Sequence, residues 1–211
     1  MSTFAKRERL LLADLLETAG PDAPTLCEGW LTRDLAAHVV VRERRPDAAG
    51  GLVLKQLSSR LDKAMEEFAA KPYEELIQLI RTGPPRFHPF NLKQIDEVSN
   101  TIEFYVHTED VRRAQPDWST RDLDPVFQDA LWSRMERTAR LMGRGAATGL
   151  VLRRPDGQTT VAHRGTPVVT VTGEPSELLL YLYGRQAAAT VGVDGDPDAI
   201  AKLHAGKQLG I

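Results

Sequence analysis

Apolar residues recur at helical spacing over roughly the first 142 positions of the chain. The first apolar stripe runs from Phe4 to Leu16 and ends at Gly20-Pro21, and prolines and glycines separate the later stripes. Thr32 offers an N-cap for the second helix, and Pro46 limits it. The pattern predicts a bundle of helices joined by loops. Beyond the first two, the expected helices are Leu52 to about Ala69, a short one from Pro72, Gln94 to about Ala114, and about Pro125 to Met142.

After Gly143 the apolar positions alternate with a period of two, which is typical of strands. Leu150–Leu152 and Thr159–His163 flank a Pro-Asp-Gly turn and predict a hairpin, and the β-branched run Val168–Thr172 predicts a further strand. A helix opening near Pro175 follows, and then a short strand and a last helix. We therefore expect an α+β protein with a helical domain at 1–145 and a small α+β domain at 146–211.

Composition narrows the class of protein. Apolar residues make up 42% and charged residues 27% of the 211, which is ordinary for a globular protein. The net charge of −2 gives no electrostatic reason to expect nucleic acid as a partner. Cys27 is the single cysteine, so an intramolecular disulfide is impossible. No signal peptide and no apolar run of membrane-spanning length is visible, and we expect a cytoplasmic protein that does not bind membranes.

Candidate chemistry lies on the helix expected from Gln94 to Ala114. Glu103 and His107 are four residues apart, so they project from one face, and Asp110 lies on nearly the same face. His38 sits in an apolar stretch of the second helix, with Asp34 four residues earlier as a possible acceptor for its ring. Two histidines and a carboxylate can bind a divalent metal and leave positions open for water or substrate.

Spacing alone leaves several alternatives open. A histidine on an apolar face is more often an ordinary core residue than a ligand. Asp110 fits a fourth ligand, an acceptor that orients a ligand, a general base, or an ion pair with an arginine. Cys27 fits a small packed hydrophobe better than a reactive thiolate. Glu109 points off the ligand face and suits a surface pair with Arg112 or Arg113, and His88 fits an exposed loop residue better than a cover over the metal.

Two segments carry a resemblance to a known family. Residues 26–43, LCEGWLTRDLAAHVVVRE, look like the second-helix signature of the DinB-like superfamily, and residues 103–114, EFYVHTEDVRRA, are similar to its later-helix signature. The resemblance is narrower to mycothiol-dependent maleylpyruvate isomerases and their metal-binding relatives. It implies a DinB-like four-helix bundle with a sterol-carrier-like tail. It also implies a metal, usually zinc, held by His38, Glu103 and His107.

The same resemblance suggests an activity. A metal-bound thiol such as mycothiol would add to an electrophilic small molecule, in isomerisation or group transfer. The isomerases also use an arginine from the tail, for which Arg185 is our candidate, although a solvated helix-end arginine explains that position as well. Asp110 is the other catalytic candidate. Alternatives are a non-catalytic metal- or small-molecule-binding protein and a metal-assisted hydrolase. Nickel, iron and manganese also suit the ligand set, and both a monomer and a homodimer are compatible with the sequence.

Overall fold

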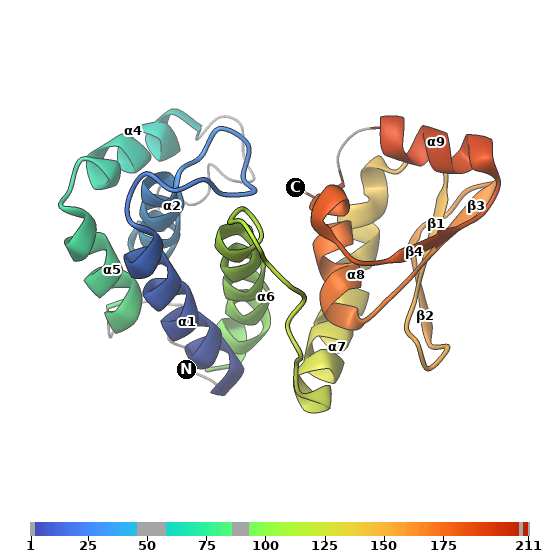
Figure 1. Ribbon diagram of the computed structural model, residues 1–211, viewed down its shortest axis with the longest axis horizontal. Coiled ribbons are helices and arrows are strands. Elements are labelled where there is room, and N and C mark those ends of the chain that lie inside the picture. The colour runs from blue at the N-terminus through green and yellow to red at the C-terminus, as the bar shows by residue number, and fades with distance from the viewer. Residues whose placement is uncertain (1–2, 46–57, 86–92, 207–208, 211) are drawn as a thin grey trace. The chain divides into compact units, whose positions relative to one another are not determined.

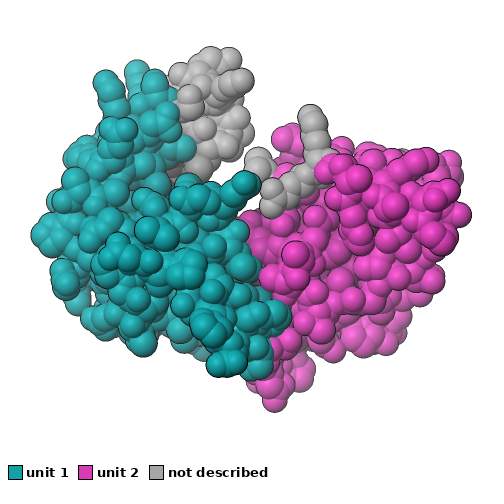
Figure 2. Space-filling view, turned by 45° about the horizontal axis from the view of Figure 1, so that its top comes forward, with its two compact units in different colours: residues 1–119 teal, residues 120–211 magenta. Residues whose placement is uncertain are grey.

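The computed structural model describes residues 3–45, 58–85, 93–206 and 209–210 (Figure 1). The chain forms two compact units, residues 1–119 and 120–211, which Figure 2 distinguishes by colour. The first unit is helical and the second combines a small sheet with helices, so the predicted α+β class is confirmed.

The helices of the first unit follow the predicted stripes closely. Helix α1 packs against α5 and α6, and α2 packs against α4 and α5. None of the helices within the described residues is long and apolar enough to cross a membrane. Residues 52–57 of the predicted third helix lie outside the described residues, as does His88. The bounds are α1 Thr3–Ala19, α2 Thr32–Arg44, α4 Ser58–Ala69, α5 Tyr73–Thr82 and α6 Lys93–Arg112.

The start of α2 differs from the prediction by one residue. Leu31 rather than Thr32 is the N-cap, and the Leu31 N–H donates to Asp34 Oδ2 at 3.0 Å. Thr32 is instead buried, and its hydroxyl donates to the carbonyl oxygen of Gly20. Asp34 therefore stabilises the helix start, where its negative charge also suits the helix dipole. This bond corrects the expectation that Asp34 orients the ring of His38.

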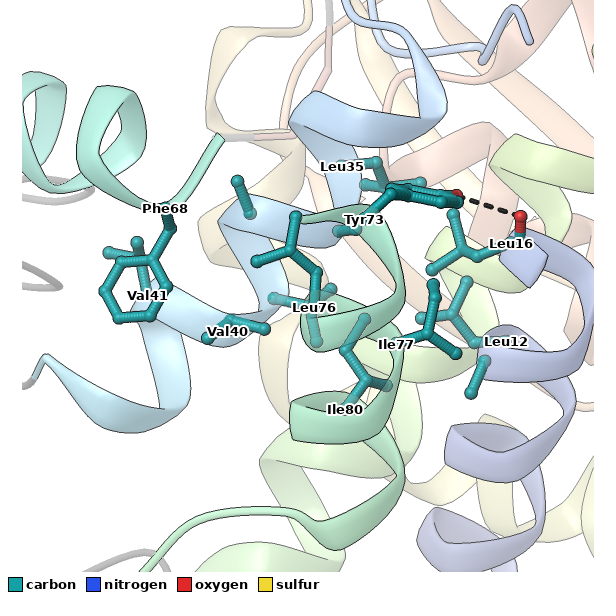
Figure 3. Packing of buried hydrophobic residues seen from close by; sticks show 14 of the residues in the cluster. Leu12, Leu16, Leu35, Val40, Val41, Phe68, Tyr73, Leu76, Ile77 and Ile80 are labelled. Atoms are coloured by element: carbon teal, nitrogen blue, oxygen red, sulfur yellow. Dashed lines mark hydrogen bonds between the residues drawn. The ribbon is translucent and has the colours of Figure 1, made fainter. Parts of the chain in front are cut away.

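The apolar core of the first unit lies where α1, α2, α4 and α5 meet (Figure 3). Leu12 and Leu16 of α1 pack in the same cluster as Leu76 and Ile77 of α5, and all four are fully buried or nearly so. The Tyr73 hydroxyl donates to the Leu16 carbonyl at 2.9 Å, which satisfies its one polar atom in this apolar surrounding. The resulting core fixes the position of α2, which carries His38.

A buried ion pair joins α1 to α2. Arg9 and Glu43 are each 1% exposed, and both terminal nitrogens of Arg9 donate to the carboxylate, Nη1 at 2.6 Å from Oε2. Arg9 Nη1 also donates to the Ile80 carbonyl at 2.8 Å, and the guanidinium lies 4.4 Å from the centre of the Phe104 ring. These contacts offset the cost of burying both charges and join four helices at one point.

The second unit contains a four-stranded sheet in the order β2-β1-β3-β4. The predicted hairpin is present, with β1 (Gly149–Arg153) antiparallel to β2 (Thr159–His163). Strand β3 (Val168–Thr172) pairs parallel to β1 and antiparallel to β4 (Gly192–Asp194). The apolar helix α8 (Pro175–Leu182) is buried along its whole length, which explains its run of leucines. Helices α7 (Pro125–Met142) and α9 (Pro197–Ala205) complete this unit, with short 3-10 turns at Gly143–Gly145 and Gln186–Ala188.

Helix α7 belongs to the second compact unit by its contacts, whereas the predicted helical domain at 1–145 includes it. It packs against α8 and β2, and Phe127, Leu131 and Met135 are fully buried. Gln128 of α7 exchanges hydrogen bonds with Ser176 at the start of α8, at 3.1 and 2.9 Å. The apolar periodicity of an amphipathic helix shows which face is buried but not which element covers that face. The sequence therefore did not predict that α7 packs against α8 and β2. The domain boundary at 145/146 stays a prediction.

We predict that Glu43→Gln lowers the free energy of unfolding by about 3–5 kcal/mol, because it leaves the buried Arg9 guanidinium without a countercharge. The double variant Arg9→Met, Glu43→Leu recovers most of this loss, since it removes both charges and keeps apolar volume. Urea unfolding measures both effects.

The matched control is Glu17→Gln. Glu17 also lies on α1, but its side chain is exposed and pairs with Arg81 of α5. This substitution should change stability far less than Glu43→Gln. If the two single variants lost equal free energy of unfolding, burial would not be the reason that the Arg9–Glu43 pair stabilises the protein.

Candidate metal centre

Two regions far apart in the sequence, residues 27–38 and 103–110, supply the candidate site. Helix α2 supplies His38, α6 supplies Glu103, His107 and Asp110, and the α1–α2 loop supplies Cys27. The α6 residues follow the helical repeat, so they line one face as the sequence predicted. The two histidine side chains are 9% and 10% exposed and that of Glu103 is 24% exposed, so the carboxylate is the most accessible of the three.

One carboxylate oxygen is the centre of the site. Glu103 Oε1 lies 3.2 Å from His38 Nε2 and 3.2 Å from His107 Nε2. The two imidazole rings meet edge-on with their centres 5.2 Å apart, and the Trp30 ring lies 5.1 Å from that of His38. The structure therefore brings together all three residues predicted as metal ligands.

Charge at the site follows from these contacts. Burial opposes ionisation of Glu103, but the Arg42 guanidinium and the two imidazoles hold the pKa of its carboxyl well below its usual value. Burial lowers the pKa of His38 and outweighs its hydrogen bond with Glu103. Hence Glu103 is an anion and His38 is neutral near pH 7, which are the forms of these side chains that bind a metal ion.

His107 is in a different electrostatic position. Burial alone would lower its pKa, but hydrogen bonds with Asp110, Cys27 and Glu103 together raise that pKa well above its usual value. The protonated imidazole thus lies between two carboxylates, with Nδ1 at 2.9 Å from Asp110 Oδ2 and Nε2 at 3.2 Å from Glu103 Oε1. A cation is already favoured at this point of the bundle.

The donor set fits a divalent transition-metal ion. The candidate ligand atoms of His38, Glu103 and His107 all lie within 4.8 Å of one another. In a tetrahedral zinc site, nitrogen and oxygen ligands bonded at about 2.0–2.2 Å are about 3.4 Å apart, close to the 3.2 Å between Glu103 Oε1 and each imidazole nitrogen. Three residues of this type can hold zinc and leave a coordination position open to a small molecule.

Asp110 is fully buried and contacts both His107 and Cys27. Its Oδ2 lies 2.9 Å from His107 Nδ1 and 3.2 Å from Cys27 Sγ. Of the alternatives open from the sequence, this contact favours an acceptor that orients a histidine. Cys27 is half-buried and packs against the core of the first unit, as expected of a small apolar residue, but its sulfur also belongs to the polar cluster.

Two neighbours of the site were not identified from the sequence. Arg42 Nε lies 3.3 Å from Glu103 Oε1, and its Nη1 donates to the Oδ1 of the fully buried Asn100 at 2.6 Å. Arg42 follows His38 by four residues and Asn100 precedes Glu103 by three, so helical spacing alone places each beside a ligand. A search for polar residues at those spacings would have found both.

The structure also places Glu109 and Arg185, two other residues considered from the sequence. Glu109 pairs with Arg112 and Arg113 as predicted, with Arg113 Nε at 2.6 Å, but the group is not at the surface because Glu109 is fully buried. Arg185 lies in the second unit, in the turn after α8, where its Nη1 donates to the Tyr183 carbonyl at 2.6 Å. The catalytic role of Arg185 stays a prediction.

Comparisons with known proteins agree with the resemblance seen in the sequence. Residues 5–90 match the family model of the mycothiol maleylpyruvate isomerase N-terminal domain, which confirms that resemblance for the region bearing His38. Curated proteins give no match.

Two solved structures share the fold of this chain. One is the mycothiol-dependent maleylpyruvate isomerase, with a TM-score of 0.61 and 17% sequence identity. The other is a histidine-to-alanine mutant of a mycothiol-dependent maleylpyruvate isomerase, with a TM-score of 0.62 and 16% identity. In both comparisons the match covers 91% of this chain and 90% of the other chain. At this identity the likeness establishes the architecture.

Proposed function

We propose that the first unit binds one divalent cation, zinc before nickel, iron or manganese, through His38, Glu103 and His107. The observation that carries this proposal is the convergence of both imidazole Nε2 atoms on one oxygen of Glu103, each at 3.2 Å. Two nitrogens and one carboxylate oxygen are a ligand set typical of catalytic zinc, with a position left for a further ligand.

The further ligand in this proposal is a low-molecular-weight thiol of the mycothiol type. An ion at this site would lower the pKa of a bound thiol, so that the thiolate forms at neutral pH. Solved structures of the same fold are of mycothiol-dependent isomerases, which supports a thiol over water as the entering group. The protein would then be an isomerase or a transferase acting on a small electrophile.

The residues around the site have separate tasks in this reaction. Asp110 holds the ring of His107 through Nδ1, and Arg42 keeps Glu103 ionised. In an isomerisation, the thiolate sulfur adds to one carbon of a conjugated double bond, the resulting single bond rotates, and the thiolate leaves unchanged. In a conjugation, the adjacent carbon takes a proton from water and the sulfur–carbon bond remains. Asp110 and Arg185 stay candidates for assisting these steps.

Thiol entry can be tested by absorption spectroscopy on the Cys27→Ser protein loaded with Co²⁺. Without an added thiol the proposed ligands are nitrogen and oxygen only, so we expect no sulfur-to-cobalt charge-transfer band. Mycothiol should produce that band at one equivalent, and His38→Ala in the same background should abolish it. Glutathione and 2-mercaptoethanol serve as comparison thiols.

Bound cobalt with no band on addition of any of the three thiols would contradict thiol activation. That result, combined with a higher melting temperature in the presence of metal, would favour the alternative of a non-catalytic metal-binding protein. Mycothiol-dependent turnover of an electrophile would instead support the enzyme.

A second test concerns Asp110. We predict that Asp110→Asn weakens zinc binding about 10–100-fold, because the loss of a carboxylate partner makes a ligating imidazole less basic and less well oriented. Competition with a chromophoric chelator measures the affinity. Asp14→Asn, which removes an exposed carboxylate paired with Arg81, is the matched control and should leave zinc affinity unchanged. Equal zinc affinities for the parent protein and Asp110→Asn would show that Asp110 does not contribute to metal binding.

A further inference from the structure

Cys27, His107 and Asp110 form a second group of metal-ligating atoms next to the first. One ligand atom from each lies within 4.8 Å of the other two. Asp110 is fully buried and His107 is 8% exposed, so this group is not a set of surface side chains that come together by chance. It differs from the first group in chemistry because it includes a sulfur.

The loop that carries Cys27 is fixed to α6 and to the turn that follows it by hydrogen bonds. The Leu26 N–H donates to the Asp110 carbonyl at 3.0 Å, and the side chain of Gln115 donates to the Pro24 carbonyl at 3.0 Å. Within the loop, the Thr25 hydroxyl donates to the Trp30 carbonyl at 2.8 Å and accepts from the Cys27 N–H at 3.2 Å. The Cys27 sulfur is therefore held in place before any ligand binds, as a preformed site requires.

The distances within the group suit an ion that replaces two protons. Asp110 Oδ2 lies 3.2 Å from Cys27 Sγ and 2.9 Å from His107 Nδ1, so the thiol and the imidazole N–H point at the same oxygen. For a tetrahedral ion of the size of Zn²⁺, with a sulfur bond of about 2.3 Å and nitrogen and oxygen bonds of about 2.0–2.2 Å, these separations would be about 3.6 and 3.4 Å. The group would open by about half an ångström for an ion of that size, and by more for the larger Cd²⁺.

We propose that Cys27, His107 and Asp110 are a second ligand set, which binds a thiophilic divalent cation such as Cd²⁺ through Sγ, Nδ1 and Oδ2. Thiolate ligands select such ions, whereas the nitrogen and oxygen atoms of the first set accept a wider range. A neutral imidazole offers a lone pair on one ring nitrogen only, so His107 serves one set at a time. The protein then binds a single ion, and the softness of that ion decides which set holds it.

Ultraviolet absorption during a Cd²⁺ titration tests this proposal with no added thiol. We expect a sulfur-to-cadmium charge-transfer band in the parent protein that saturates at one equivalent. His38→Ala should keep this band because the second set does not use His38. Cys27→Ser should still bind one equivalent of Cd²⁺, now at the first set, without the band. His107→Ala should lose the band, and circular dichroism checks that each variant is folded.

Three results would overturn the proposal: Cd²⁺ bound to the parent protein without a sulfur band, no Cd²⁺ bound to the parent protein, or a band that His38→Ala removes. This inference does not depend on thiol activation at the first set. The cobalt experiment on Cys27→Ser removes the second set altogether, so either proposal can fail while the other stands.

Discussion

The structure of the site depends on one partly buried carboxylate oxygen, Glu103 Oε1, that faces three nitrogen groups. Glu103 Oε1 meets His38 across the bundle, His107 one turn along the same helix, and Arg42 beside His38. An ionised carboxylate inside a helical bundle is costly unless charge and hydrogen bonds compensate for its lost hydration. The positions of α2 and α6 satisfy that requirement, and they also create a donor set with the chemistry of a metal site.

Each charged group at the site is in turn held by a neighbouring polar side chain. Asn100 holds Arg42, Arg42 keeps Glu103 ionised, and Asp110 orients His107 from the opposite side of its ring. Because His107 has a carboxylate at each ring nitrogen, it connects two ligand sets of different chemistry. In the proposal above, the ion that binds decides which ring nitrogen of His107 is its ligand.

The sequence predicted those features that depend on local spacing. The four-residue separation of Glu103 and His107 placed both on one face of α6, and the hairpin of β1 and β2 followed from alternation around a turn. His38 depended more on the family resemblance, since an apolar-face histidine has an ordinary explanation. Cys27 and Asp110 are 83 positions apart, and their contact follows from how the loop packs on α6, which no periodicity encodes. The parallel pairing of β1 with β3 likewise depends on the route that the chain takes between the two strands, which the alternation of apolar residues does not encode.

Metal content is the most direct test of metal binding by His38, Glu103 and His107. The protein, expressed without a histidine tag and supplied with zinc, should contain close to one equivalent of metal by elemental analysis. His38→Ala, Glu103→Ala and His107→Ala should each lose it while remaining folded, and His204→Ala, which changes a histidine in the second unit, should retain it. A parent protein that stays metal-free after zinc or nickel is supplied would contradict metal binding at this site. The two histidines would then be core residues paired with a partly buried carboxylate.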